Sequence, residues 1–454
     1  MTRAKSSERL SAYGWIAIVT VSLGGFLFGF HSAVVSGALG VLQKKFLLTP
    51  LQEGLIVSLL LLGAGVGSIF AGTLSDYFGR KRMILITGLV FTIGAATTAS
   101  AADLTMILLG RLLTGFGVGF ISLAAPLYLA EISPPSKRGA IVATNQFVGT
   151  IGILTAYVVN YLFLDTGNWR AMFAVGMIPS GLLMLGMIFL PDTPEWLLAH
   201  RTEDSAKDVL QKLRKDKSWE SHLAEMKRVA SPRKDSSWHR LFTPSVKFAL
   251  FVGVMLSVLQ QITGINGVIY YAPKIFIEAG FGSDATSVLA TMGIGVINVL
   301  TTFLALKLLD RAGRRPLLLI GVLGMLISLL ILSGSLFMKL PQVGPIAVVT
   351  LMSYVAFFAL GMGPIPWLIL AEIYPLSVRG RAMSIATAAN WFFNFLIAIT
   401  FLDMIKFMGS AGVFLLFAAI SLIAFFAIKR YVPETKGKSL EEIELHMNEM
   451  RNRR

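Results

Sequence analysis

The chain contains no cysteine, and charged residues make up only 14% of its 454 residues. Without cysteine the protein can form neither a disulfide nor a thiol-based active site. About a quarter of the residues of a typical soluble domain are charged. The low charge, a hydrophobic fraction of 55% and a mean hydropathy of +0.72 therefore exclude an ordinary soluble domain and indicate a membrane protein.

Other signals are missing as well. The sequence has no N-x-[ST] acceptor for N-glycosylation, which favours a prokaryotic inner membrane over a eukaryotic cell surface. Its five histidines are scattered without metal-ligand spacing, and no nucleophile–base pair or phosphate-binding loop stands out. The sequence therefore predicts that the protein is not an enzyme and that it holds neither a metal ion nor a cofactor.

Long apolar runs take the place of these signals. Residues 83–102 carry no charge, and about 20 such residues cross the hydrocarbon core of a bilayer. We predict an all-α membrane protein with twelve transmembrane helices, the first of which is retained rather than removed as a signal peptide. The predicted spans are 13–36, 54–75, 83–102, 104–130, 140–163, 171–190, 247–272, 285–308, 316–337, 345–373, 382–403 and 410–431.

The net charge of +15 could indicate nucleic-acid binding, but its distribution argues against that function. If the N-terminus is cytoplasmic, nearly all Lys and Arg residues fall on the cytoplasmic side. Those that fall outside are Lys44, Lys45, Arg170, Lys274, Lys339 and Lys406. This asymmetry is the positive-inside pattern of a multi-pass protein with both termini in the cytoplasm. The partner of the chain is then the lipid bilayer, not nucleic acid.

A polar interval, residues 191–246, separates the first six spans from the last six. Its stretch "TEDSAKDVLQKLRKDKSWESHLAEMKRV" begins with Thr and acidic residues and continues with basic ones, which is typical of short amphipathic helices. The sequence thus predicts an N-terminal six-helix bundle (1–190), a cytoplasmic linker with short helices (191–246), a C-terminal six-helix bundle (247–432) and a cytoplasmic tail (433–454). We expect a monomer.

The two halves share two motifs. The stretches "GTLSDYFGRKRM" (72–83) and "LKLLDRAGRRPL" (306–317) both read D-x-x-G-R-[KR]. The stretches "PLYLAEISPPSKRGA" (126–140) and "PWLILAEIYPLSVRGRA" (366–382) both contain A-E-I-x-P followed by R-G. Both motifs recur at nearly the same offset, which indicates a duplicated six-helix unit. Transporters built from such pseudo-symmetric repeats bind their substrate between the two halves.

These motifs resemble those of the sugar porter family of the major facilitator superfamily. The resemblance also rests on "PDTPEWLL" (191–198), "QQITGIN" (260–266), "GPIPW" (363–367) and "PETKGKSLEEIE" (433–444). It covers nearly the whole chain and extends to both the proton-linked xylose symporters and the facilitative glucose transporters of the family. It implies a carrier that moves a monosaccharide, a hexose or a pentose, by alternating access.

Polar residues inside the apolar spans are the candidates for the sugar site. Gln260, Gln261 and Asn266 lie together in the seventh span, where Gly264 and Gly267 can loosen the helix. A carboxamide both donates and accepts hydrogen bonds, as a sugar hydroxyl does, and it carries no charge whose burial would cost at least about 2.5 kcal/mol. For a single amide, hydrogen bonding between helices is the competing explanation.

Other spans contribute further candidates. The amides are Gln146, Asn298, Asn390 and Asn394, and the aromatic rings that could lie against a sugar are Trp367 and Trp391. The resemblance implies that Gln146, Gln260, Gln261, Asn266, Asn298 and Asn390 contact sugar hydroxyls, with Trp367 beside the ring and Tyr270 and Tyr271 shaping the outer gate. Facilitative glucose transporters carry a Glu where this chain has Ala359, which puts strict glucose selectivity in question.

Charges of opposite sign repeat at the cytoplasmic span ends of both halves. They are Asp76, Arg80, Glu131 and Arg138, with the repeats Asp310, Arg314, Glu372 and Arg379. Such pairs can hold the halves together when the cavity opens outward and release them when it opens inward. The competing explanation, charge at the membrane edge, suits Lys81 or Arg82. The resemblance implies the same inner-gate network, except that Glu195 stands where the family has an Arg.

The mode of coupling depends on the first span, "GGFLFGFHSAVVSGAL" (24–39). By the resemblance, proton-linked relatives carry an Asp at the position of His31, paired with an Arg that matches Arg111, and facilitative relatives carry an Asn. Carboxylates are the usual proton carriers in membranes, and this span has none. The sequence therefore favours facilitative transport. Proton symport through His31 stays open, because an unperturbed imidazole titrates near neutral pH.

Two other functions suit the same fold less well. A non-transporting sugar sensor usually carries long cytoplasmic tails, and only a short tail follows Pro433 here. An exporter of drugs or organic ions would favour an acidic or aromatic cavity over a set of neutral amides.

Overall fold

A computed structural model describes residues 10–134, 137–215, 218–229, 243–281, 283–375, 378–438 and 442–443. Within these ranges the secondary structure is helical apart from one isolated bridge between Leu10 and Arg214. The first half contains α1 (Ala12–Ala33), α2 (Val35–Phe46), α3 (Pro50–Phe78), α4 (Arg80–Ala99), α5 (Leu104–Ile132), α6 (Arg138–Leu162), α7 (Trp169–Ala174) and α8 (Met177–Phe189).

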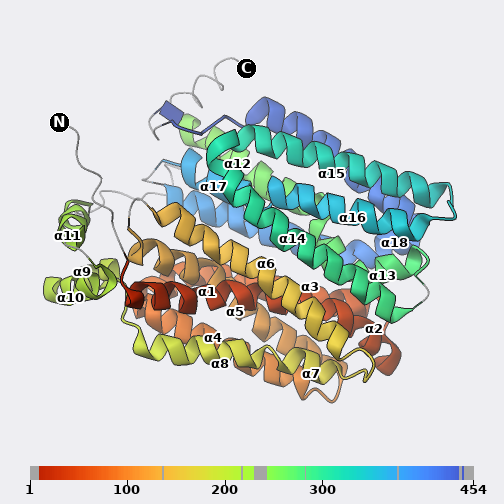
Figure 1. Cartoon of the computed structure of the whole chain (residues 1–454), viewed down its shortest axis with the longest axis horizontal. Coiled ribbons are helices and arrows are strands. Elements are labelled where there is room, and N and C mark those ends of the chain that lie inside the picture. The colour runs from red at the N-terminus through yellow and green to blue at the C-terminus, as the bar shows by residue number, and fades with distance from the viewer. Residues whose placement is uncertain are drawn as a thin grey trace.

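Three short helices and a second set of long helices follow. The short ones are α9 (Pro194–His200), α10 (Glu203–Leu213) and α11 (Ser218–Val229). The second set is α12 (Pro244–Ile262), α13 (Ile265–Glu278), α14 (Asp284–Ala312), α15 (Arg314–Phe337), α16 (Val343–Leu360), α17 (Ile365–Ile373) and α18 (Arg379–Tyr431). Figure 1 shows α1–α8 and α12–α18 as two bundles side by side, with α9–α11 beyond one end.

The described part of the chain has helices for twelve membrane crossings. In the described part of the chain, eleven helical segments are long and apolar enough to span a bilayer. The last, α18, has 53 residues and a non-helical Gly409 (φ 71°, ψ 162°) in its interior. Because a span needs about 20 residues, α18 crosses twice and turns at Gly409. The predicted all-α fold with two six-helix bundles is confirmed, although the first span does not end at residue 36: α2 continues to Phe46.

Two spans of the second bundle are interrupted. The span Val246–Glu278 breaks between α12 and α13, where Gly264 adopts a left-handed conformation (φ 96°). The span Val343–Ile373 breaks between α16 and α17 at residues 361–364. The expected loosening is thus found at Gly264, whereas Gly267 lies within the regular helix α13. Interrupted helices leave backbone carbonyls free to bind other groups inside the membrane.

The duplicated D-x-x-G-R motif forms the same turn in each half. Gly79 joins α3 to α4 with φ 90° and ψ 154°, and Gly313 joins α14 to α15 with φ 89° and ψ 163°. Positive φ favours glycine because it has no Cβ. The repeat seen in the sequence is therefore a repeat of backbone geometry, and it places Arg80 and Arg314 at the first positions of equivalent helices.

The short helices α9–α11 are attached to the first bundle. The backbone N–H of Ser11 donates to the carbonyl of Leu213 (3.0 Å), and Arg214 Nη1 donates to the carbonyl of Ile132 at the end of α5 (2.9 Å). Ser11 also caps α1 by accepting from the N–H of Gly14. The described part of the predicted linker contains the helices α9, α10 and α11, and its residues 216–217 and 230–242 lie outside the described residues.

Candidate functional site

Four carboxamides meet at the break between α12 and α13. Asn266 Nδ2 donates to Gln261 Oε1 (2.6 Å), and Gln261 Nε2 donates to Asn390 Oδ1 on α18 (3.1 Å). Asn390 Nδ2 in turn donates to Gln260 Oε1 (2.7 Å). The three bonds form a chain that joins Gln260, Gln261, Asn266 and Asn390, which we call the amide cluster. Its first three members occupy the centre of the span Val246–Glu278.

The break in the neighbouring span supplies the remaining partners. Gln260 Nε2 donates to the carbonyls of Met362 (2.6 Å) and Gly363 (3.1 Å), which lie between α16 and α17. Asn390 Nδ2 also donates to the carbonyl of Ser257 on α12 (3.0 Å). The amide cluster therefore joins three helices of the second bundle, α12, α13 and α18, to the break between α16 and α17.

The amide cluster is chemically suited to a neutral polyhydroxylated ligand. Its side chains are buried apart from the half-buried Asn266, so every polar atom needs a partner. Because each carboxamide donates and accepts, a ligand hydroxyl can replace a neighbouring amide at little net cost in hydrogen bonds. The side chains of the cluster carry no charge, which suits a neutral ligand.

The structure does not join all predicted sugar contacts to this cluster. Gln146 is exposed on α6, Trp367 is half-buried on α17, and Asn298 is buried on α14. Within the described residues no hydrogen bond links any of the three to the amide cluster. Their assignment as sugar contacts stays a prediction.

Trp391 lies at the boundary between the two bundles. Its ring meets Phe28 of α1 edge-on, with the ring centroids 6.0 Å apart. Its indole Nε1 is buried and has no partner among the described residues. Trp391 follows Asn390 on α18, so the chain that carries a member of the amide cluster also carries this indole. Trp391 is a candidate that the family resemblance alone did not single out.

Tyr270 and Tyr271, the predicted outer-gate residues, are both buried on α13. The Tyr271 hydroxyl donates to the carbonyl of Ala398 on α18 (2.7 Å), and its ring stacks on Phe401 at 5.0 Å. The Tyr157 hydroxyl of α6 donates to the carbonyl of Ile269 on α13 (3.0 Å). The helix that carries both tyrosines thus contacts both bundles.

His31 and Arg111 are in contact, but Arg111 bonds to the backbone carbonyl of His31 and not to its imidazole ring. Arg111 Nη1 donates to the carbonyl of His31 (2.9 Å), and Arg111 Nε donates to the carbonyl of Ile56 (3.0 Å). The His31 ring stacks on Phe91 with centroids 5.0 Å apart, and its Nε2 has no partner in the described chain. On the other side lies Gly176, where a Cβ would be 2.5 Å from His31 Cε1. The ring therefore has apolar neighbours in Phe91 and Gly176, while the Arg111 guanidinium is held at the backbone carbonyl of the same residue.

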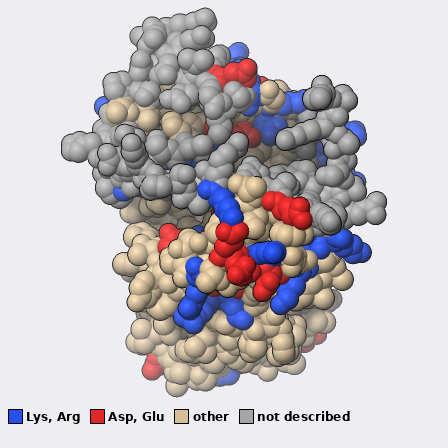
Figure 2. Space-filling view, turned by 90° about the vertical axis from the view of Figure 1, so that its left-hand side faces the viewer, with Lys and Arg blue, Asp and Glu red and all other residues tan. Residues whose placement is uncertain are grey.

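Charged side chains gather at the end of the molecule that carries α9–α11 (Figure 2). In the first bundle Arg80 pairs with Glu131 (3.0 Å) and with Asp76 (2.9 Å). In the second bundle Arg314 pairs with Glu372 (3.1 Å). The structure thus pairs Arg80 with Glu131 and, at the equivalent place in the second bundle, Arg314 with Glu372. Each of these two pairs joins helices of the same bundle.

The remaining predicted gate residues are less connected. Arg138 is exposed at the start of α6. Arg379 Nε donates to the carbonyl of Tyr374 (3.2 Å), and its Nη2 is buried without a partner among the described residues. The side chain of Asp310 lies outside the described residues. The gate role of all three stays a prediction.

A third repeated motif contacts the Arg80–Glu131 and Arg314–Glu372 pairs, and it was not recognised as a repeat in the sequence. Thr193 donates to Glu131, and Thr435 donates to Glu372. The preceding residues, Asp192 and Glu434, each accept backbone N–H groups at the start of α4 or α15: Asp192 from Lys81 (3.3 Å), and Glu434 from Arg314 (3.1 Å) and Arg315 (3.0 Å). The signal was P-[DE]-T, present in both "PDTPEWLL" and "PETKGKSLEEIE".

The pKa values of the two repeated carboxylates shift in opposite directions. Burial raises the pKa of Asp192 above its ordinary value, and the backbone N–H donors offset this only in part. Burial acts in the same direction on Glu434, but the N–H groups of Lys436, Arg314 and Arg315 together lower the pKa of Glu434 below its ordinary value. The second bundle therefore holds the more firmly ionised carboxylate.

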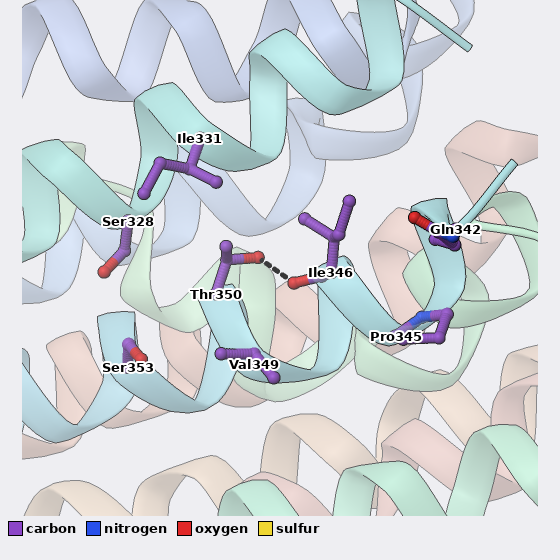
Figure 3. Close-up of a pocket in the computed structure, with 8 residues that line it drawn as sticks. All are labelled: Ser328, Ile331, Gln342, Pro345, Ile346, Val349, Thr350 and Ser353. Atoms are coloured by element: carbon purple, nitrogen blue, oxygen red, sulfur yellow. Dashed lines mark hydrogen bonds between the residues drawn. The ribbon is translucent and has the colours of Figure 1, made fainter. Parts of the chain in front are cut away.

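A surface hollow of the second bundle lies apart from the amide cluster. It is a groove of about 500 Å³ between α15 and α16, lined by residues that include Ser328, Ile331, Gln342, Val349 and Thr350 (Figure 3). Ile331 and Val349 are exposed within membrane spans, so the groove faces lipid. The Thr350 hydroxyl donates to the carbonyl of Ile346 in its own helix (2.7 Å). The groove therefore offers few free polar groups to a sugar.

Gly264 is the position where the geometry of the amide cluster is most easily broken. A Cβ there would lie 2.3 Å from Cδ2 of Phe417, and the residue has φ 96°. We expect Gly264→Ala to lower the free energy of unfolding by about 2–3 kcal/mol, from backbone strain plus the clash, and to weaken sugar binding. Thermal unfolding in detergent and equilibrium binding would measure the two effects.

Gly280→Ala is the matched control, because Gly280 has the same φ of 96° and no other group within 4 Å of the position that a Cβ would take. It should cost only the backbone strain, about 1–2 kcal/mol. Equal losses for the two variants would show that the packing of Phe417 against Gly264 does not matter.

Comparison with known proteins agrees with this architecture. The family described as "Sugar (and other) transporter" matches residues 17–446. The glucose transporter GlcP of Staphylococcus epidermidis is 36% identical over 97% of this chain and 98% of its own, and the galactose-proton symporter of Escherichia coli is 37% identical over 98% and 97%. The inward-open xylose transporter XylE from E. coli superposes with a TM-score of 0.83 at 32% identity, covering 95% of this chain and 99% of that structure.

Proposed function

The chain belongs to the sugar porter family of the major facilitator superfamily, and from that premise we propose that it carries a hexose or pentose across the membrane by alternating access. It is a transporter and not an enzyme. The observation that carries the choice of substrate is the amide cluster, four uncharged carboxamides held at two interrupted spans. Neutral donors and acceptors suit a neutral sugar that must bind and then leave.

We propose the following orientation and division of the chain. The end that carries α9–α11 and most basic residues faces the cytoplasm, which agrees with the positive-inside rule. The N-terminal bundle comprises 1–190, the cytoplasmic linker 191–246, the C-terminal bundle 247–432 and the tail 433–454. The pairs Arg80–Glu131 and Arg314–Glu372 then lie at the cytoplasmic face and form the core of the inner gate. The similarity to the inward-open transporter supports assigning this conformation to the inward-facing state.

We propose that transport is facilitative. The backbone carbonyl of His31 accepts a hydrogen bond from Arg111, while its ring stacks on Phe91 and its Nε2 has no partner among the described residues. Nothing in this arrangement delivers a proton from water to the ring or favours an imidazolium beside a guanidinium. Proton symport through His31 is the second candidate, favoured by the similarity to a galactose-proton symporter.

Uptake into proteoliposomes tests the proposal. Labelled glucose, galactose and xylose would be supplied with and without an inward proton gradient. We expect at least one of these sugars to equilibrate faster than in protein-free liposomes, without accumulating above its external concentration, and His31→Asn to behave like the parent.

Two outcomes would contradict the proposal in different ways. Accumulation driven by the proton gradient and lost in His31→Asn would establish symport through His31. Failure of all three sugars to enter faster than in protein-free liposomes would overturn the choice of substrate.

A further inference from the structure

Among the described residues, two ion pairs join the two bundles, and both lie at the end remote from α9–α11 (Figure 1). Lys274, near the end of α13, contacts Glu53 in the first turn of α3. Lys44, near the end of α2, lies 2.8 Å from Asp284 in the first turn of α14. In the proposed orientation both pairs face the outside of the cell. They hold the outer ends of the bundles together in the inward-facing state.

The two pairs differ in how much their loss would matter. The side chains of Lys44 and Asp284 are 70% and 51% exposed, whereas those of Lys274 and Glu53 are 26% and 4% exposed. Exposed ion pairs contribute little to stability because water competes for both charges. A buried carboxylate that loses its partner is left in a poorly solvated place, which is costly. Loss of the Glu53–Lys274 pair should therefore weaken the contact between the outer ends of the two bundles more than loss of Lys44–Asp284.

Helix α13 connects this pair to the sugar site. Its outer end carries Lys274, its middle accepts the Tyr157 hydroxyl at the carbonyl of Ile269, and its inner end carries Asn266 of the amide cluster. At Gly264 the helix is separated from α12 by a break in the span. Because α13 is one helix of 14 residues, a shift of Lys274 is passed along it toward Asn266, although Pro273 in its interior permits bending beside Lys274.

We propose that Glu53 and Lys274 form an electrostatic lock on the outer side, which closes the outer ends of the bundles and sets the balance between inward-facing and outward-facing states. Lys44–Asp284 supports the lock without controlling it. Opening the lock, together with release of the Tyr157–Ile269 hydrogen bond, separates α13 from the first bundle and allows Asn266 to exchange Gln261 for a sugar hydroxyl. The inference rests on the proposed alternating access, but not on the identity of the sugar.

The chain provides a direct way to observe this opening. Because it has no cysteine, a single introduced cysteine reports without background. Gly54 of α3 faces the other bundle, since a Cβ there would lie 2.8 Å from the carbonyl of Ile399. Ser58 lies one helical turn further on the same face and is fully buried. Ser58→Cys should therefore react with a membrane-impermeant maleimide only when the outer side opens.

The test compares labelling rates of Ser58→Cys in reconstituted protein without sugar. Glu53→Gln and Lys274→Met should each raise the rate at least about fivefold, as expected for a change of about 1 kcal/mol or more between two states. The charge reversal Glu53→Lys with Lys274→Glu should restore a rate close to that of the parent. Thermal unfolding of each variant separates opening of the lock from loss of the fold.

Glu203→Gln is the matched control, because it breaks the exposed ion pair to Lys227 within the cytoplasmic helices. It should leave the labelling rate unchanged. The proposal is overturned if the two single variants label like the parent, or if the charge reversal labels as fast as the single variants while the protein stays folded. Both results concern the gate alone, so they are distinct from a failure of sugar uptake.

Discussion

Gln261→Ala is expected to weaken sugar binding by about 100-fold. Gln261 is the only member of the amide cluster that bonds directly to both Asn266 and Asn390 among the described contacts. In the proposed complex its carboxamide donates one hydrogen bond to a sugar hydroxyl and accepts another, and the alanine can make neither. Two lost hydrogen bonds at about 1–2 kcal/mol each correspond to roughly two orders of magnitude in the dissociation constant.

Equilibrium binding of a labelled sugar to the purified protein would measure this effect. Gln342→Ala is the matched control, because Gln342 is an amide of the same chemistry at the lipid-facing groove between α15 and α16. The control should bind sugar like the parent. If Gln261→Ala also bound like the parent, the amide cluster would have to be a structural feature rather than the sugar site.

Arg80→Leu is expected to lower the free energy of unfolding by about 3 kcal/mol and to abolish transport. The Glu131 side chain is only 4% exposed, and its oxygens meet Arg80 and Thr193. Removing the guanidinium leaves a buried carboxylate without a counter-charge, which is among the costliest changes in a protein interior. Arg314→Leu should act similarly but less strongly, since Glu372 is 21% exposed.

Thermal unfolding in detergent, together with uptake in proteoliposomes, would test this second prediction. Arg82→Leu is the control, because Arg82 belongs to the same basic run but is exposed. It should change stability by less than about 0.5 kcal/mol. Similar losses for Arg80→Leu and Arg82→Leu would mean that only the overall positive charge of this face matters.

The sequence predicted those features of the fold that depend on composition and repetition. Apolar length alone indicated twelve spans, and the repeated D-x-x-G-R and A-E-I-x-P motifs singled out Arg80, Glu131, Arg314 and Glu372 before any geometry was known. The pairs Arg80–Glu131 and Arg314–Glu372 follow from the duplication, because the same residues recur at the same turn. Periodicity and repetition are properties that a linear sequence displays directly.

Features that depend on distant backbone could not be predicted in this way. The carbonyls of Met362 and Gly363 become partners of Gln260 only because the span Val343–Ile373 breaks beside it. Lys274 appeared in the sequence only as one of a few external basic residues, since nothing local indicates that Glu53, far earlier in the chain, faces it. Likewise, the use of the His31 carbonyl by Arg111 depends on how α1 and α5 pack.

The neutrality of the amide cluster has an electrical consequence. Moving one elementary charge through a membrane potential of 100 mV changes the free energy by about 2.3 kcal/mol. A neutral sugar held by Gln260, Gln261, Asn266 and Asn390, with no ion moving alongside it, carries no charge through that field. In such a facilitative carrier the membrane potential would drive neither uptake nor release of the sugar. The concentration gradient of the sugar alone would set the direction of transport.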